Sequence, residues 1–217
     1  MKKILVPTDF SKPAQIAVDV AADIARKAKS ELILLHVVEE AEGGSFNVEG
    51  EATGSGNWEN KLFTMKLIEK AKKQLAKAVE DTKLQGIKVR PEIRLGSAFH
   101  GMTTIISERK VDLVVMGTAG HSDLEHMIIG SNTEKVVRLA HCPVLTVHKK
   151  PANSDFKNIV YATSMSKDEE VFSRIVKNAQ GLYDATVHLV RINTPGNFQR
   201  DAVVKKYMNC GSAVEIE

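Results

Sequence analysis

The sequence predicts an α/β fold in which buried parallel strands alternate with helices, and three observations support this prediction. Short apolar runs recur along the first 150 residues, as is typical of strands covered on both faces. Segments with helical periodicity, several opened by a capping serine, separate these runs. A loop containing glycines joins one run, residues 113–116, to a helical segment that begins near Ser131. Together these features indicate one parallel sheet with helices on both faces.

The amino-terminal segment predicts a βαβ unit. Residues 3–7 (KILVP) form the first apolar run, and residues 31–38 (ELILLHVV) form the second. Between them Ser11 is placed to cap a helix, since serine accepts hydrogen bonds from first-turn N–H groups. An alanine-rich stripe over residues 14–28 marks the helix face that is expected to lie close to the sheet. Two parallel strands joined by such a helix form a right-handed crossover.

Residues 40–60 predict a flexible loop, because they contain five glycines and several small polar residues among acids. Trp58 lies in this segment. A single tryptophan more commonly packs against its own domain, and anchoring a partner is the alternative. From Leu62 to Gln85 the pattern is helical, with lysines opposite an apolar face. That face is expected to pack inward and carries Met65, Ile68, Ala71, Leu75, Ala78 and Val79.

The remaining elements complete the alternation. Residues 87–95 predict a strand, and Pro91 within it indicates a sheet edge because proline cannot donate to a strand ladder. A helix is expected at about residues 98–109, before the strand that leads to the glycine loop. Residues 143–148 (PVLTVH) predict the fifth strand.

The loop after the fourth strand has the composition of an anion-binding site. Gly117 and Gly120 follow the strand, and Gly130 and Ser131 precede the next helix. Glycines let backbone N–H groups approach a ligand closely, and the first turn of a helix offers N–H donors at the positive end of its dipole. The alternative is structural: Ser131 and Glu134 would form a capping box and the glycines would only make turns. The joint occurrence of strand, glycines and capped helix favours the anion site.

The glycine spacing G-x2-G-x9-G-S resembles the nucleotide loop of the universal stress protein family, in its ATP-binding branch, and the resemblance extends over about residues 2–148. It implies an adenine nucleotide alpha-hydrolase-like (Rossmann-like) open parallel sheet of five strands in the order 3-2-1-4-5. The fifth strand of such domains commonly pairs across a dimer interface. The resemblance assigns the phosphates and ribose of ATP to Gly117, Gly120, Gly130, Ser131 and Thr133, with Met116 beside them. Asn132 and His121, the latter near the phosphates, complete this part of the predicted nucleotide site.

Asp9 follows the first strand, and ligands of open α/β sheets bind beyond the carboxyl ends of the strands. From position alone, Asp9 could equally cap a helix or turn the chain. The resemblance favours a contact between Asp9 and the nucleoside. It also places Pro7 and Thr8 beside the adenine and implies a contact between the adenine and the backbone of Val37. No spacing rule alone would have selected Val37. His36, in the same apolar strand, is expected to be a satisfied core histidine.

The resemblance implies an ATP-binding regulatory module of the stress response. The chain has no G-x-x-x-x-G-K-[ST] motif and no nucleophile motif, so no catalytic residue is assigned and little or no hydrolysis is expected. Mg²⁺ is expected to bind through the phosphates, because such ions keep several waters and need few protein ligands. The alternative is a nucleotide-independent dimeric interaction scaffold with a vestigial loop.

Composition argues against several other functions. With a net charge of +3, scattered lysines and 5% aromatic residues, the chain has neither a nucleic-acid footprint nor a stacking platform. No signal peptide or membrane-spanning run is evident, and Cys142 and Cys210 lack metal-ligand spacing, which predicts a cytoplasmic protein with free thiols and no membrane contact. His121 and His126 are five residues apart, unlike the i, i+4 pair of a zinc helix, so no metal site is assigned.

An incomplete second repeat follows at an offset of 155 residues, which places Asn158 on Lys3 (158 − 3 = 155) without a gap over some thirty-five residues. A repeat of this length indicates duplication. We therefore predict a stress-protein domain at residues 1–150 and a partial second one at residues 151–217.

The second repeat is not expected to bind ATP. Ser164 stands where the first repeat has Asp9, and the sequence provides no second glycine loop. A lone βαβ unit exposes an apolar sheet edge and face, which are expected to be buried against the first domain or a second chain. The sequence thus predicts a homodimer, formed through the fifth strand or through the partial repeat.

Overall fold

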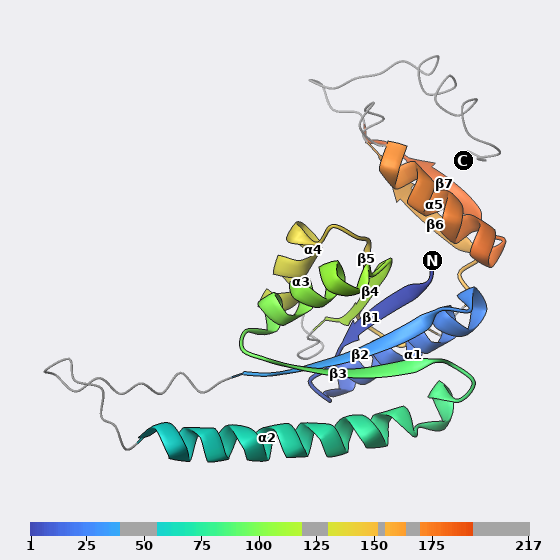
Figure 1. The fold of residues 1–217 in the computed structure, drawn as a ribbon. Coiled ribbons are helices and arrows are strands. Elements are labelled where there is room, and N and C mark those ends of the chain that lie inside the picture. The colour runs from blue at the N-terminus through green and yellow to red at the C-terminus, as the bar shows by residue number, and fades with distance from the viewer. Residues whose placement is uncertain (40–55, 119–129, 152–154, 164–169, 193–217) are drawn as a thin grey trace, which may run out of the picture. The chain divides into compact units, whose positions relative to one another are not determined.

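The computed structural model describes residues 1–39, 56–118, 130–151, 155–163 and 170–192. The chain divides into two compact units, Met1–Ala152 and Asn153–Glu217. Each unit has its own sheet (Figure 1), and each is described by itself below.

The first unit is a five-stranded parallel sheet in the order β3-β2-β1-β4-β5, which confirms the predicted fold class. Helices α3 and α4 cover one face of the sheet, and α1 and α2 cover the other (Figure 1). The strands are β1 (Lys3–Pro7), β2 (Glu31–Val38), β3 (Val89–Leu95), β4 (Leu113–Gly117) and β5 (Val144–Val147). The helices are α1 (Lys12–Ala28), α2 (Gly56–Val79), the 3-10 turn η1 (Thr82–Leu84), α3 (Ala98–Arg109) and α4 (Ser131–Leu139).

Both faces of the central strands are buried, as continuous apolar runs predict. Residues 4–6 of β1 and residues 32–35 of β2 are at most 1% exposed. On the α3 side, Met102 and Ile105 pack into one cluster with alternate residues of these strands. On the other side the alanines of α1 let its axis lie close to the sheet, and Ala17 is fully buried. The sheet is therefore a rigid platform that fixes the loops at its carboxyl edge.

The ends of α1 and the position of β3 follow the sequence predictions. The Ser11 Oγ accepts a hydrogen bond from the Ala14 N–H at 3.4 Å, which confirms Ser11 as the N-cap of α1. Strand β3 lies at one edge of the sheet, as Pro91 predicts, and β5 lies at the opposite edge.

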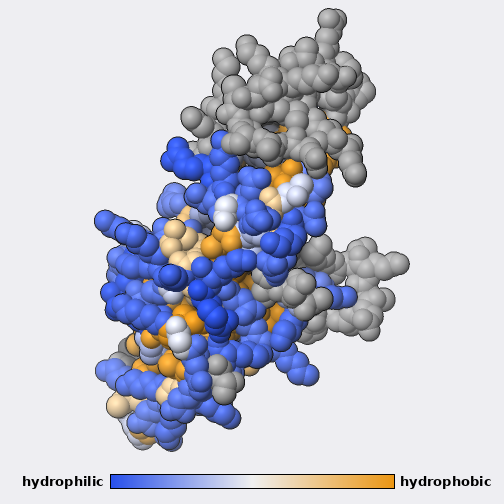
Figure 2. Space-filling view, turned by 90° about the vertical axis from the view of Figure 1, so that its right-hand side faces the viewer, coloured by the Kyte–Doolittle hydropathy of each residue, from blue (hydrophilic) through white to orange (hydrophobic). Residues whose placement is uncertain are grey.

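Helix α2 differs from the prediction in where it begins, in where it ends (Val79 and not Gln85) and in which residues it buries. It begins at Gly56, so Trp58 lies in the helix and not in a loop, with 62% of its surface exposed. Met65 was expected to pack inward and is 61% exposed, whereas Ala71 and Leu75 are buried. Trp58, Leu62 and Met65 recur at i, i+4 and i+7, so they share the outward face. Figure 2 shows apolar residues on the surface at the height of α2. Among the described residues, no helix combines the length and the apolar character that a membrane span requires.

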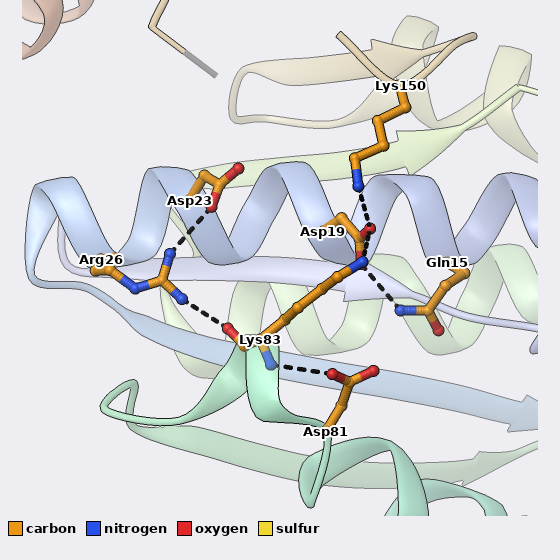
Figure 3. Close-up of polar contacts among 7 residues, drawn as sticks. All are labelled: Gln15, Asp19, Asp23, Arg26, Asp81, Lys83 and Lys150. Atoms are coloured by element: carbon orange, nitrogen blue, oxygen red, sulfur yellow. Dashed lines mark hydrogen bonds and ion pairs between the residues drawn. The ribbon is translucent and has the colours of Figure 1, made fainter. Parts of the chain in front are cut away.

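A buried carboxylate on α1 ties two other parts of the first unit to this helix (Figure 3). Asp19 is 8% exposed, and its Oδ2 pairs with the Lys83 Nζ from η1 and, at 3.4 Å, with the Lys150 Nζ beyond β5. The Gln15 Nε2 donates to the Asp19 Oδ1 at 3.1 Å. Burial raises the pKa of Asp19, but the hydrogen bonds from Lys83 and Gln15 and the lysine charges outweigh burial, so the pKa is lowered.

The Asp19→Asn variant is expected to lower the free energy of unfolding at pH 7 by about 1–2 kcal/mol, because it removes charge-assisted hydrogen bonds from partly exposed lysines. Since folding lowers the pKa of Asp19, its ionised form stabilises the fold above the unfolded-chain value of about 3.9, and this contribution is lost as the pH falls through the folded pKa. Urea denaturation at pH 7 and below pH 3 tests this. The exposed Asp23→Asn serves as control, and an Asp19→Asn deficit that persists undiminished in acid would contradict the assignment.

The second unit contains β6 (Asn158–Ala162), α5 (Glu170–Tyr183) and β7 (Thr186–Val190), with β6 and β7 parallel. Asn158 pairs with Thr186 as Lys3 pairs with Glu31, so the register is repeated at the same offset (186 − 31 = 155). Ser164, which stands at the position of Asp9 in the second repeat, lies outside the described residues.

The two units differ in burial at equivalent positions. Val160 of β6 is 67% exposed, whereas its counterpart Leu5 in β1 is fully buried beneath α3. Among the described residues of the second unit, α5 is the one helix that packs on the strands. Within the described residues of the second unit, one face of the β6–β7 sheet therefore carries exposed apolar side chains.

Candidate functional site

A cavity of about 900 Å³ lies at the carboxyl ends of β1, β2 and β4, next to the first turns of α1 and α4. This is the point where the strand order reverses, since β1 has β2 on one side and β4 on the other. Its volume is within the range of small-molecule sites. The described lining residues include Pro7, Thr8, Asp9, Ser11, Lys12, Pro13, Ala14, Ile16, Leu35, His36, Val37, Glu39, Ala98, Met102, Met116, Gly117, Gly130, Ser131, Asn132, Thr133 and His148.

The β1–α1 loop presents Asp9 to this cavity. The Thr8 N–H donates to the Leu35 carbonyl at 2.8 Å and so continues the pairing of β1 with β2. The Asp9 Oδ1 accepts the Ser11 N–H at 2.9 Å, while the residue as a whole is exposed. Asp9 therefore stands on an ordered turn with carboxylate oxygen left to accept a hydrogen bond from a ligand.

His36 and Phe10 pack together beside Asp9. The His36 Nδ1 lies 2.7 Å from the Thr8 carbonyl oxygen, which can only accept, so Nδ1 carries the hydrogen. The rings of His36 and Phe10 are 4.6 Å apart between centroids and tilted by 36°. As predicted, His36 is hydrogen-bonded within an apolar strand, but it is only partly buried and also lines the cavity.

The two described glycines of the loop have different structural roles. A Cβ atom on Gly117 would lie 2.4 Å from the Pro13 carbonyl oxygen, so β4 can approach the first turn of α1 only without a side chain here. At Gly130 the nearest atom of the described residues to a Cβ would be the Thr133 Oγ1 at 3.9 Å. Gly117 is thus needed for packing, whereas no described residue fills the space beside Gly130.

Gly130, and not Ser131, is the N-cap of α4, which corrects the predicted capping serine and its capping box with Glu134. Because glycine has no side-chain acceptor, it leaves the first-turn N–H groups of α4 available to a ligand. Thr133, which the resemblance places in the phosphate and ribose group, is buried, and its Oγ1 donates to the Gly117 carbonyl at 3.4 Å. Ser131 is exposed and keeps its hydroxyl available.

The structure brings the described members of the predicted site together. All of them line the one cavity: Pro7, Thr8, Asp9, Val37, Met116, Gly117, Gly130, Ser131, Asn132 and Thr133. Met116 is 5% exposed and belongs mainly to the core beneath the cavity. The other two predicted residues, Gly120 and His121, lie outside the described residues.

Several lining residues were missed by the sequence reasoning. Lys12 is exposed in the first turn of α1, and among the described lining residues it is the one lysine. His148 lies at the end of β5, where its Nδ1 is 3.1 Å from the Thr118 Oγ1. For Lys12 the position after a capping serine was a usable signal, because the first turns of helices bind anions. For His148 the sequence offered none, since its place depends on the pairing of β4 with β5.

The charges around the cavity are mixed. Lys12 and the amino-terminal ends of two helices favour an anion, and Asp9 and Glu39 are the described acidic residues of the lining. Within the described residues, no three His, Cys, Asp or Glu side chains cluster as metal ligands. The lining thus offers donors for anionic groups of a ligand and carboxylate acceptors for its hydroxyl groups.

Comparison with known proteins identifies the family. The model of the universal stress protein family matches residues 1–148. The chain belongs to the universal stress protein family. Universal stress protein MJ0531 of Methanocaldococcus jannaschii is 34% identical over 150 residues, which cover 69% of this chain and 83% of that protein. Universal stress protein YxiE of Bacillus subtilis is 30% identical over 151 residues, covering 67% and 97%.

Solved structures share the fold of this universal stress protein. The structure titled as a structure-based assignment of the biochemical function of hypothetical protein MJ0577 matches with a TM-score of 0.55 and 32% identity, over 70% of this chain and 98% of that one. A universal stress protein from Archaeoglobus fulgidus matches with a TM-score of 0.74, over 99% of this chain and 76% of that one. Its 18% identity supports the fold alone.

Proposed function

We propose that this universal stress protein binds ATP in the cavity at the carboxyl ends of β1, β2 and β4, and acts as a nucleotide-dependent regulatory module of the stress response. The observation that carries the proposal is that the amino-terminal end of α4, which has no side-chain cap, lines the same cavity as Asp9, with no described atom closer than 3.9 Å to a Cβ at Gly130. The cavity volume suits a nucleotide. The helix end suits its phosphates, and the acceptor on Asp9 suits its nucleoside.

Each part of the ligand has described residues that suit it. The phosphates would lie against the N–H groups of Ser131 and Asn132, with the Lys12 ammonium as a further partner. The nucleoside would lie between Asp9 and the backbone of Val37. Mg²⁺ would bind through the phosphate oxygens and water, because the described lining offers no cluster of protein ligands for it. Gly120 and His121 remain predicted contacts.

ATP turnover is expected to be below about 1 s⁻¹, the low end of ordinary enzyme rates. The described lining contains one lysine, on the first turn of α1, and the chain has no phosphate-binding lysine motif that could draw charge from a leaving phosphoryl group. A phosphate-release assay with purified protein, ATP and Mg²⁺ measures this. Sustained turnover well above that rate would make the protein an ATPase, and the nucleotide a substrate instead of a switch.

A second candidate function is a nucleotide-independent dimeric scaffold. It is favoured by apolar side chains near the edge strand β5: on the adjoining α4, Val137 is 50% exposed and Leu139 is 57% exposed. A homodimer formed along this edge would cover them. Sedimentation tests whether the chain dimerises along this edge, and a monomer at high micromolar concentration would count against the scaffold.

Thermal unfolding with and without nucleotide tests the proposed function directly. At a concentration of one hundred times its dissociation constant, a ligand that binds only the folded state adds about 2.7 kcal/mol of stability. ATP with Mg²⁺ is therefore expected to raise Tm by several degrees. If millimolar ATP, ADP and AMP all leave Tm unchanged, the scaffold is the better account.

A further inference from the structure

We propose that His36 and Phe10 are positioning residues that hold the Asp9 carboxylate in place for the nucleoside. This inference rests on the proposed nucleotide-binding function. His36 comes from β2, and Phe10 comes from the loop that carries Asp9, so the contact between their rings joins the loop to the sheet.

Hydrogen bonds hold every residue of this turn. The Thr8 N–H donates to Leu35, and the Thr8 carbonyl accepts the His36 Nδ1–H at 2.7 Å. The Thr8 Oγ1 accepts the Phe10 N–H at 3.0 Å, and the Asp9 Oδ1 accepts the Ser11 N–H at 2.9 Å. The Asp9 side chain is thus bonded to the Ser11 amide, on a turn whose Thr8 carbonyl is bonded by His36 from the neighbouring strand.

The backbone of Phe10 shows that this turn is held against its intrinsic preference. Phe10 has φ = 65°, in the left-handed region that bulky side chains rarely adopt. Such a conformation persists only where the surroundings over-determine it, and it is frequent at ligand sites. Here the surroundings are the His36 ring and the Thr8 hydroxyl. Without them the turn is expected to relax and to carry Asp9 with it.

The consequence for the ligand concerns the second carboxylate oxygen of Asp9. The Ser11 N–H engages Oδ1, which leaves Oδ2 as the acceptor for a hydroxyl of the nucleoside. A carboxylate fixed before binding loses less rotational freedom when the ligand arrives. The His36–Phe10 pair therefore contributes to affinity through Asp9, and not by touching the ligand.

His36 also lines the cavity, so direct contact with the nucleotide is the competing explanation, and a double-mutant cycle separates the two. His36→Phe keeps a ring but loses the donor to Thr8, and Phe10→Asn loses the ring but tolerates left-handed backbone. Each is expected to weaken ATP binding by roughly 3- to 10-fold, the effect of one hydrogen bond or ring contact. On an Asp9→Ala background, neither should weaken binding further.

Two more variants and one ligand-free measurement complete the experiment. His36→Asn restores a donor near the position of Nδ1 and is expected to recover part of the affinity. His141→Phe is the matched control, because His141 is exposed between α4 and β5, away from the amino-terminal end of α4. Hydrogen exchange of the Phe10 and Ser11 amides should accelerate in His36→Phe relative to the core amide of Val114.

The outcomes are distinct. Loss of affinity on the natural background alone, with faster exchange at Phe10 and Ser11, supports the positioning role. Equal losses with and without Asp9, or no loss at all, overturn it. If the natural protein does not bind ATP, the proposed function fails. Hydrogen exchange then still tests whether His36 orders the turn: unchanged exchange at Phe10 and Ser11 in His36→Phe overturns the positioning role.

Discussion

The Gly130→Asp variant is expected to fold like the natural chain and to bind ATP at least about 100-fold more weakly. The new carboxylate would face the phosphates, and like charges about 4 Å apart at a partly shielded site repel by about 4 kcal/mol. It would also accept the first-turn N–H groups of α4, which are the donors proposed for the phosphates. The fold is expected to tolerate the change because Gly130 has φ = −58° and its Cβ would meet no atom of the described residues closer than 3.9 Å.

Gly130→Asn is the matched control for this prediction. Asparagine has the size of aspartate and also caps helices, but it carries no charge. Isothermal titration with ATP and Mg²⁺ should therefore give an intermediate affinity for Gly130→Asn, and Tm without nucleotide should not fall in either variant. Undiminished ATP binding by Gly130→Asp would place the phosphates elsewhere.

The Gly117→Ala variant is expected to lose about 3 kcal/mol of stability, at the upper end of the cost of overpacking. The added Cβ would lie 2.4 Å from the Pro13 carbonyl oxygen and 3.1 Å from the Ala14 nitrogen. These are backbone atoms at the capped start of α1 and cannot move aside as a side chain could. Either β4 or the first turn of α1 must shift, and both border the cavity.

Urea denaturation measures this loss, and Gly130→Ala is the matched control. Its Cβ would meet no described atom closer than 3.9 Å, so its loss of stability should stay within about 1 kcal/mol, the cost of alanine at an N-cap. If Gly117→Ala proves as stable as Gly130→Ala, then α1 does not approach β4 as closely as described, and the wall of the cavity at Gly117 needs revision.

Sequence patterns predicted those parts of the fold that depend on local chemistry. The apolar runs of β1 and β2 predicted buried strands. A serine at position 11, just before a helical pattern, predicted the N-cap of α1, and Pro91 predicted an edge strand. The strand order came from the family resemblance, because periodicity does not say which strands are neighbours. The site residues that the resemblance named and the structure describes all line one cavity.

The errors arose where a residue's role depends on contacts far along the chain or on a shift of a single residue. The role of Gly117 in packing depends on Pro13, more than one hundred positions away (117 − 13 = 104). The cap of α4 was wrong by one residue, a usual uncertainty for helix ends. Met65 was assigned to the packed face because apolar character alone does not show where the sheet beneath α2 ends.

The central claim is that ATP binds across the carboxyl edge of the sheet, and a crystal structure of the protein grown with excess ATP and Mg²⁺ tests it most directly. The phosphates should lie on the first-turn N–H groups of α4 beside Gly130, with the nucleoside between Asp9 and Val37. Density for ATP at another surface, or a cavity filled by the protein's own side chains under these conditions, would contradict the claim.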